Sequence, residues 1–340
     1  MTFRSIEICA GAGGQALGLE QAGFEHECLV EFEPAACETL RLNRPSWNVV
    51  HGDVREFSGL KFSGIDLLAG GVPCPPFSKA GKQLGSTDER DLFPEALRLV
   101  REIKPKAVML ENVRGLLDPV FGDYRRMILD SLSEHGYVGE WKLINASDCG
   151  VSQLRPRAIL VALQEKYLPG FEWPHPNAVP PATVGQVLAD LMAANGWKGV
   201  AEWQAKANQI APTLVGGSKK HGGPDLGPTR AKKAWAALGV DGMGLANSAP
   251  EMNFVGMPRL TVRMAARIQG FPDEWQLSGP KTSAYRQVGN AFPPPVALAV
   301  GRQIRAALLN TEQSSTRNGI HHGQTPKTRS KRFAQGTLFE

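Results

Sequence analysis

The chain has 340 residues, of which 42% are hydrophobic and 21% are charged, and this composition excludes a disordered chain. No apolar run is long enough to span a bilayer and the N-terminus lacks a secretory signal, so we expect a soluble, cytoplasmic protein that does not associate with a membrane. The five cysteines are widely spaced without CxxC pairs, which argues against a disulfide framework or a metal site. A net charge of +5 mildly favours a polyanionic partner.

Short apolar runs alternate with helical patterns over the first half of the chain. Strands are predicted over residues 5–9, 27–30, 47–50, 65–69, 107–110 and 158–163, and helices over 15–22, 34–42, 91–103 and 123–134. Such alternation is typical of α/β proteins with a doubly wound, mostly parallel sheet. The length suggests two domains or one large one.

The amino-acid composition changes after Trp173, where prolines and then glycines become frequent. We therefore predict a domain boundary there, with a smaller domain over 174–283. Regular patterning returns over 260–270 and in an apolar helix over 295–309, so the first domain is predicted to comprise 1–173 plus 284–310. Residues 311–340 are polar and basic, and a flexible tail is expected.

Glycines and acids follow the first three predicted strands. Cys9 leads into the glycine-rich turn Ala10-Gly-Ala-Gly-Gly14, and Glu31 and Asp53 follow the next two strands. A turn without side chains lets a ligand approach the backbone, and an acid about 20 residues later suits ribose hydroxyls. Each feature alone is weak, since tight turns and solvated acids are common. Together they predict a nucleoside-shaped site, and the displaced third glycine favours an adenosine cofactor other than NAD.

Cys74 follows the fourth predicted strand in the run Gly70-Gly-Val-Pro-Cys-Pro-Pro-Phe-Ser78. The prolines fix the backbone around this thiol, and a rigidly held cysteine at the functional edge of a sheet is a candidate nucleophile. The alternative is a buried structural cysteine, which is the common fate of a lone cysteine. The other four cysteines fit that alternative.

Charged side chains end two further segments. Glu111 follows the strand over 107–110, where burial can raise its pKa and let it donate a proton. In an extended segment, Gln153, Arg155 and Arg157 point to one face, and two guanidiniums suit an anionic or carbonyl-rich ligand. A salt-bridged or capping acid and a solvated arginine pair are the alternatives.

Taken in chain order, these motifs resemble those of the C5-cytosine DNA methyltransferases of bacterial restriction-modification systems. The resemblance covers nearly all of residues 4–310. The matching segments are 8–14, 31–32, 52–54, 71–78, 88–93, 111–113, 153–157, 259–263, 267–272 and 285–294.

The resemblance implies an enzyme that transfers a methyl group from S-adenosylmethionine to C5 of a flipped cytosine in duplex DNA. Residues 174–283 would then form the target-recognition region. The implied catalytic residues are Cys74 as nucleophile, Glu111 at the N3/N4 edge, and Arg157 and Arg155 on the O2 side. The implied cofactor-binding residues are Cys9, Ala10, Gly11, Ala12, Gly13, Gly14, Glu31, Phe32, Asp53, Val54, Pro73, Leu92, Asn290 and Ala291.

Three residues depart from the family pattern: Glu7 stands in place of aspartate, Cys9 in place of an aromatic residue, and Met264 in place of an acid. The candidates for DNA contacts are Thr213, Leu214, Lys219, Lys220 and His221. A solvated or phosphate-binding loop is the alternative for the last three. We expect a monomer that acts on double-stranded DNA, and pairing with a restriction endonuclease fits the resemblance.

Three other functions compete with this interpretation. A transfer-RNA cytosine methyltransferase would carry a Cys-Phe-Thr tripeptide after Glu-Asn-Val, which this chain lacks. A catalytically inactive DNA-binding protein would be expected to lose Cys74 or Glu111, and both are present. A nicotinamide dehydrogenase would explain the glycine turn and Glu31 but neither the Cys74 loop nor the paired arginines.

Overall fold

The computed structural model describes residues 2–73, 91–216 and 225–318. Cys74, Lys219, Lys220 and His221 lie outside the described residues. Seven strands form one sheet in the order β3-β2-β1-β4-β5-β7-β6. Their bounds are β1 Phe3–Ile8, β2 Phe24–Glu31, β3 Val49–His51, β4 Leu67–Gly70, β5 Ala107–Val113, β6 Tyr137–Asn145 and β7 Pro156–Gln164.

Strands β1 to β5 pair in parallel, whereas β7 runs antiparallel to both β5 and β6. The predicted doubly wound, mostly parallel α/β sheet is therefore confirmed. The strand β6 was not predicted, because Glu140 and Lys142 interrupt its apolar pattern on an edge that is partly open to solvent.

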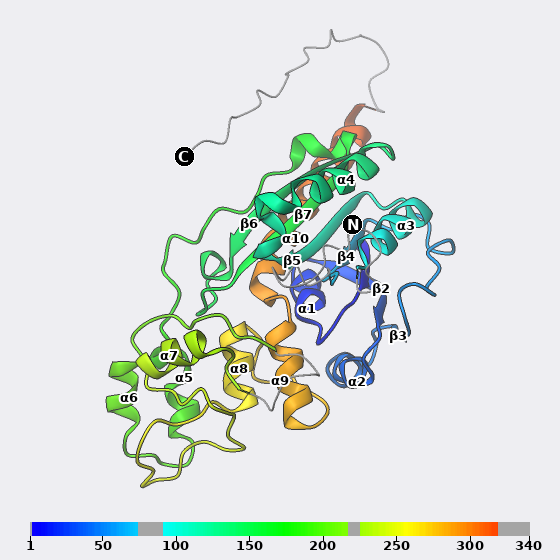
Figure 1. Ribbon diagram of the computed structural model, residues 1–340. Helices are drawn as coiled ribbons and strands as arrows, with labels where there is room; N and C mark the ends of the chain where they lie inside the picture. The colour runs from blue at the N-terminus through cyan, green and yellow to red at the C-terminus, as the bar shows by residue number, and fades with distance from the viewer. Residues whose placement is uncertain (1, 74–90, 217–224, 319–340) are drawn as a thin grey trace.

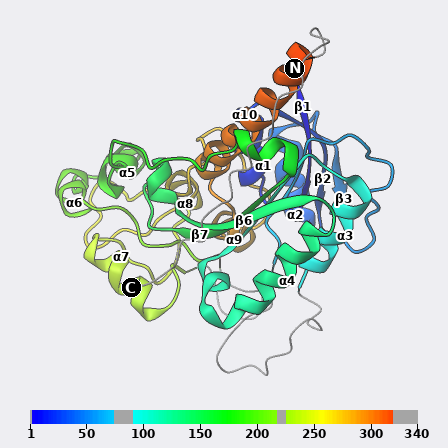
Figure 2. The same cartoon turned by 90° about the horizontal axis from the view of Figure 1, so that it is seen from above.

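Helices cover both faces of the sheet (Figures 1 and 2). Apolar side chains of α3 (Phe93–Ile103) and α4 (Gly122–Ser133) pack on one face, together with Ile6 and Leu110 of the sheet. On the other face, α1 (Gly14–Gln21) and α10 (Pro294–Asn318) pack against β-strand residues such as Met109. The remaining helix of this part, α2, spans Pro34–Asn43. Short 3-10 turns lie at Arg114–Leu117, Pro119–Phe121, Ala146–Cys149 and Glu165–Gly170.

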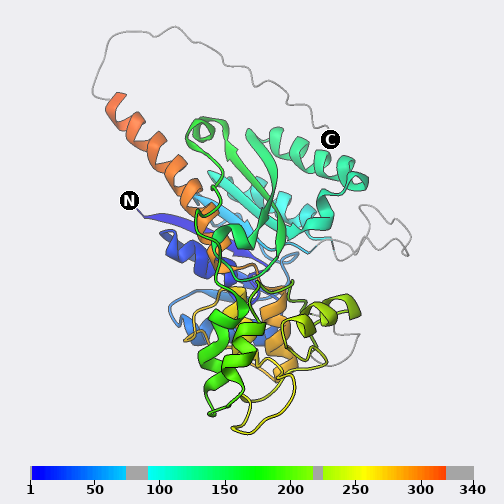
Figure 3. The same ribbon diagram turned by 90° about the vertical axis from the view of Figure 1, so that its left-hand side faces the viewer.

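The described residues of 174–283, which we call the helical lobe, lie below the sheet in Figure 3. They carry α5 (Val184–Ala193), α6 (Val200–Lys206), α7 (Thr229–Ala237) and α8 (Val262–Gln269), and α9 (Lys281–Asn290) begins at their end. The buried core of this lobe includes Trp235 and Trp275, and it continues into Ala12 and Leu17 beside the sheet. The two parts therefore share packed side chains.

Helix α10 continues to Asn318, although a flexible tail was predicted to begin at residue 311. The reason is a tertiary contact: Glu312 forms an ion pair with Lys106, which also binds Asp66 at 2.8 Å. This pairing holds α10 against the sheet at residue 312. No helix among the described residues is long and apolar enough to cross a membrane.

Candidate active site and cofactor pocket

A cavity of about 780 Å³ opens at the carboxyl ends of β1, β2, β4 and β5. This is the edge at which ligands bind in open parallel sheets. Residues from the glycine turn, the helical lobe and α9 complete its walls. Of the residues predicted for the site, it is lined by Cys9, Ala10, Gly11, Ala12, Glu31, Pro73, Glu111, Arg157, Thr213, Leu214, Asn290 and Ala291.

Glu111 and Arg157 form a buried ion pair in this cavity, with Nε of the arginine 2.6 Å from Oε1 of the glutamate. The direction of the strands explains why these two side chains lie together. Because β7 is antiparallel to β5, the start of β7 lies beside the end of β5, and Arg157 is in register with Val113. Both side chains are only 10% exposed, so solvent screens their charges weakly.

Burial raises the pKa of Glu111 above its ordinary value, and the positive charges of Arg157 and Arg155 oppose the rise. Desolvation is the largest of these effects. The carboxyl group therefore keeps its proton to a higher pH than an exposed glutamate does. Such a group can donate a hydrogen bond, or a proton, to a ligand nitrogen.

The loop that leads to Cys74 begins between the carboxylate and the glycine turn. An ideal Cβ on Gly71 would lie 3.5 Å from Oε2 of Glu111 and 3.8 Å from the carbonyl oxygen of Cys9. The side-chain amide of Asn112 donates to the carbonyl of Val72 at 2.8 Å. The backbone is thereby fixed up to Pro73, one residue before Cys74.

Arg155 lies apart from this cavity and is fully buried. Its guanidinium donates to the carbonyls of Leu214 and Gly289 at 2.7 Å and of Ala291 at 3.1 Å. It thus ties β7 to the end of the helical lobe and to the segment after α9. The geometry supports a positioning role for Arg155 rather than the direct substrate contact that the sequence suggests.

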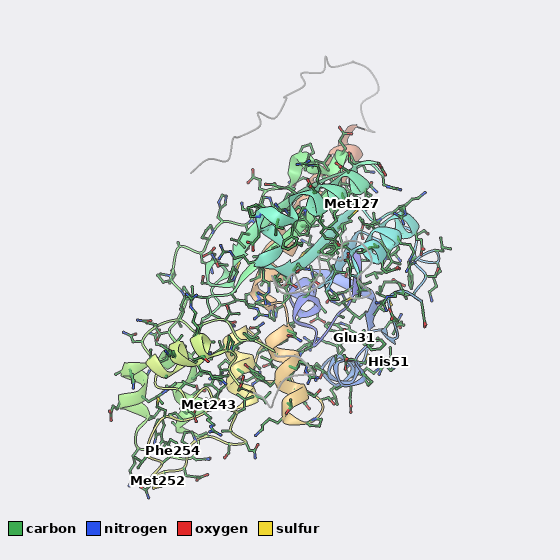
Figure 4. The ribbon with its side chains drawn as sticks, in the orientation of Figure 1. Glu31, His51, Met127, Met243, Met252 and Phe254 are labelled. Atoms are coloured by element: carbon green, nitrogen blue, oxygen red, sulfur yellow. The ribbon has the colours of Figure 1, made fainter. Side chains whose placement is uncertain are left out.

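The glycine turn is held by Glu31, whose Oε2 accepts a hydrogen bond from the backbone N–H of Gly11 at 2.6 Å. Its other oxygen accepts from the N–H of Glu33 at 2.7 Å. Glu31 ends β2 beside His51 of β3, with which it is in register (Figure 4). A carboxylate fixed in this way is preorganised to accept hydrogen bonds from ligand hydroxyls.

Two further polar side chains, Glu7 and Gln15, line the cavity with buried polar atoms. Both amide atoms of Gln15 make no hydrogen bond to the described residues, whereas the Glu7 carboxyl interacts with the backbone of Ala16. Burial and the nearby charge of Glu31 raise the pKa of Glu7 well above its usual range. Buried polar atoms of this kind require a partner, so their presence fits a pocket that receives a polar ligand. The residues present therefore suit an adenosine cofactor with a polar end.

Comparison with known proteins identifies the family. The sequence profile of the C-5 cytosine-specific DNA methylases matches residues 3–306. The chain belongs to the C-5 cytosine-specific DNA methylase family. It is 61% identical over 311 residues to the Type II methyltransferase M.NgoMIV of Neisseria gonorrhoeae, covering 91% of this chain and 99% of that protein. It is 59% identical to the Type II methyltransferase M.NaeI of Lentzea aerocolonigenes over 327 residues, covering 94% of this chain and 79% of that protein.

A solved structure with the same fold is a mutant of Spodoptera frugiperda DNMT2. It has a TM-score of 0.61 and 16% sequence identity, and the match covers 90% of this chain and all of that one. At this identity the likeness establishes the methylase fold only.

Several residues that family resemblance assigns to the cofactor do not line the cavity of this methylase. Gly13 and Gly14 serve close packing: a Cβ on Gly14 would lie 2.1 Å from the carbonyl oxygen of Phe292. Val54 is buried in the core under α3, and Asp53 pairs with Arg55 at 2.9 Å. Phe32 is 62% exposed, and Leu92 donates its N–H to the carbonyl of Pro73 at 3.2 Å. Their cofactor contacts remain predictions.

The four described cysteines of the methylase lack the properties of a nucleophile. Burial raises the pKa of the Cys28, Cys37 and Cys149 thiols to about 11. Burial and three neighbouring acids raise the pKa of Cys9 further. These thiols stay protonated at neutral pH, which agrees with their interpretation as structural residues.

The two described DNA-contact candidates, Thr213 and Leu214, line the cavity of the methylase. The hydroxyl of Thr213 donates to the carbonyl of Leu154. Leu214 is fully buried, and its N–H donates to Oε1 of Gln153 at 2.8 Å. A groove contact from the Leu214 side chain, as the sequence suggests, does not fit this burial.

Gln15, Asn112 and Gln287 also line the cavity, although their sequence patterns did not predict a place in the site. Gln15 gives a weak signal, because a glutamine directly after a glycine turn is also common on exposed helix faces. Met264, which departs from the family pattern, is explained by its place in α8. It is buried, and its sulfur accepts from the N–H of the helix-capping residue Thr261 at 3.4 Å, where an acid would complete a capping box.

Proposed function

We propose that this chain is a DNA cytosine-5 methyltransferase that transfers a methyl group from S-adenosylmethionine to a cytosine in a short duplex sequence. The observation that carries the proposal is the buried Glu111–Arg157 pair in the same cavity as the Glu31-bound glycine turn. One end of that cavity offers groups for a pyrimidine edge. The other offers groups for an adenosine cofactor.

The chemistry requires a covalent catalyst, because C5 of cytosine is a poor nucleophile. In the proposed reaction the Cys74 thiolate adds to C6 while Glu111 gives its proton to N3, which leaves a nucleophilic enamine at C5. When bound, S-adenosylmethionine supplies an electrophilic methyl group for that carbon. Loss of the C5 proton to a base then restores the double bond and expels the thiolate, and N3 returns its proton.

Glu111 and Arg157 would contact different atoms of the pyrimidine edge. The raised pKa of Glu111 favours the protonated carboxyl, the form that can donate to N3. Arg157, with five N–H donors in a fixed fork, suits the O2 oxygen, where negative charge would otherwise build during addition. Arg155 holds the surrounding backbone through its three carbonyl contacts.

The cofactor's polar parts match the polar residues of the cavity. Glu31 at the end of β2 would take the ribose hydroxyls, as the resemblance implies. Gln15 would then face the amino-acid end, since that is the remaining polar part of the cofactor and both Gln15 amide atoms are buried without a partner among the described residues. Glu7 lines the same cavity. Asn290 would close the pocket from the α9 side.

The target base must leave the helix, because its reactive carbon is inaccessible in a stacked duplex. We propose that DNA lies between the sheet and the helical lobe, with 174–283 reading the sequence and the basic residues Lys219, Lys220 and His221 contacting it. The two relatives named above are Type II methyltransferases, which supports a restriction-modification role with a cognate endonuclease. A monomeric, cytoplasmic enzyme is proposed.

Bisulfite sequencing of DNA from cells that express the chain tests this function, with Cys74→Ser as the matched control. The proposal predicts protected cytosines at one short recurring sequence with the unaltered protein and none with the variant. Protection with both proteins would refute the role of Cys74. Protection in transfer RNA alone, measured in the same cells, would refute the DNA substrate.

A further inference from the structure

The turn from Cys9 to Gly13 forms one wall of the cavity without regular secondary structure. Cys9, Gly11 and Gly13 all have positive φ, at 53°, 54° and 82°. Left-handed conformations at alternate positions turn the backbone groups in different directions. The N–H of Gly13 bonds within the turn to the carbonyl of Ala10 at 3.0 Å, and other parts of the protein hold further groups. The shape of this wall therefore depends on residues outside the turn.

The sheet and the helical lobe both support the turn. Glu31 accepts a hydrogen bond from the N–H of Gly11 at 2.6 Å. On the opposite side, Nε1 of Trp275 donates to the carbonyl oxygen of Ala12 at 3.0 Å. Trp275 follows α8, so this contact joins residues 263 positions apart in the chain.

The Trp275 ring is fixed in place by its neighbours. It is 1% exposed and stacks on Phe271 with ring centroids 5.9 Å apart. The Arg44 guanidinium lies 5.4 Å from its centroid, and Nη1 of Arg263 donates to its carbonyl oxygen at 2.8 Å. The indole is thus held between the helical lobe and the end of α2 in the sheet domain.

The ring also packs directly against the turn. A Cβ on Gly13 would lie 2.9 Å from the Trp275 ring and 2.6 Å from the side chain of Leu40. Only a glycine lets the indole come this close, so the ring and the turn cannot move independently.

We propose that Trp275 is a positioning residue that couples cofactor binding in the sheet domain to the conformation of the helical lobe. Its indole N–H fixes the orientation of the Ala12 carbonyl, and this carbonyl belongs to the wall against which the cofactor would lie. Coupling free energies are reciprocal, so cofactor binding stabilises the segment around Trp275 to the same extent. The inference rests on the proposed function, because it requires the cavity to bind S-adenosylmethionine.

Trp275→Phe removes the N–H while keeping an aromatic ring, and Trp235→Phe is the matched control. The Trp235 indole is also fully buried, but its Nε1 has no partner among the described residues. Isothermal titration with S-adenosylhomocysteine, at equal folded fractions, should show reduced affinity in Trp275→Phe, by at most the about fivefold that one net hydrogen bond contributes. Trp235→Phe should bind as the unaltered protein does. Equal affinity in all three proteins, or an equal loss in both variants, would overturn the inference.

Hydrogen–deuterium exchange provides a readout that a merely structural role would not move. S-adenosylhomocysteine should slow exchange over residues 262–276 in the unaltered protein and in Trp235→Phe. In Trp275→Phe the slowing should remain at the glycine turn but be lost over 262–276. Protection confined to the turn in the unaltered protein would refute the coupling. A complete lack of S-adenosylhomocysteine binding by the unaltered protein would instead refute the proposed cofactor, and the coupling with it.

Discussion

The Arg157 guanidinium and the Glu111 carboxylate approach to 2.6 Å in a site where each side chain is one-tenth exposed. Two opposing effects act on the protonation of Glu111 in this pair. Burial favours the neutral acid, whereas the arginine charge favours the carboxylate. When Glu111 gives its proton to a ligand nitrogen, the positive charge of Arg157 therefore compensates the carboxylate that remains.

Glu111→Gln should lower the rate of methyl transfer about 100-fold or more, because an amide can donate a hydrogen bond but not a proton. The direction of the pH dependence follows from the raised pKa of Glu111. The active, protonated form persists above the ordinary pKa of a glutamate and is lost as pH rises through the raised value. Single-turnover rates in the unaltered protein should therefore fall on the alkaline side of that pKa. An unchanged alkaline limb in Glu111→Gln would contradict this role.

Arg157→Met should move the alkaline limb to higher pH, because removal of the neighbouring charge raises the pKa of Glu111 further. The maximal rate should fall at the same time, since the O2 contact is lost. The pH profile of single-turnover methylation measures both effects. A limb that shifts to lower pH would show that Arg157 does not act on Glu111 as described.

Arg155→Met should destabilise the fold by about 3 kcal/mol or more, because it leaves buried carbonyl groups without their charged donor. Those of Leu214, Gly289 and Ala291 lose their contact. Urea denaturation gives the change in the free energy of unfolding, and Arg302→Met, at an exposed position of α10, is the control. Equal stability of the two variants would argue that Arg155 contacts substrate rather than the backbone.

Gly14→Ala should lower stability by about 2 kcal/mol, as expected for overpacking, because the new Cβ would lie 2.1 Å from the Phe292 carbonyl oxygen. Gly122→Ala, at the start of α4, meets nothing within 4 Å and should change stability by less than about 1 kcal/mol. Thermal unfolding compares the two. A neutral Gly14→Ala would mean that the contact between α1 and the segment before α10 is looser than described.

Gln15→Leu should weaken S-adenosylhomocysteine binding about fivefold while leaving the affinity for 5′-methylthioadenosine, which lacks the amino-acid end, unchanged. Its melting temperature should stay the same or rise, because two buried amide atoms without partners are removed. Calorimetric titration with both ligands separates the two roles. An equal loss for both ligands would show that Gln15 supports the pocket as a whole.

The sequence predicts most of the sheet, because buried parallel strands are continuous apolar runs bounded by turns. It predicts less where polar residues lie on a partly exposed edge, as in β6, or where prolines and glycines obscure short helices, as in α5, α6 and α7. The extension of α10 includes the Lys106–Glu312 ion pair, which joins distant parts of the chain. Local patterns carry no information about such a contact.

In the site, too, some features could be predicted from local sequence and others could not. Glu31, Glu111 and Arg157 follow from their places at strand ends, and the cavity brings them together. The antiparallel direction of β7, which sets Arg157 beside Glu111, is a tertiary property that the extended pattern of 153–157 leaves open. Trp275 looks like an ordinary core residue in the sequence, because its contact with Ala12 exists only after the helical lobe packs on the sheet.

Covalent trapping tests the central claim most directly. Duplex DNA carrying 5-fluorocytosine at the methylated position, incubated with the protein and S-adenosylmethionine, cannot lose a proton from C5 and should remain attached to the enzyme. Peptide mass spectrometry is predicted to place the adduct on Cys74 and to find Cys9, Cys28, Cys37 and Cys149 unmodified. A failure to form any covalent complex, or attachment at another cysteine, would contradict the account.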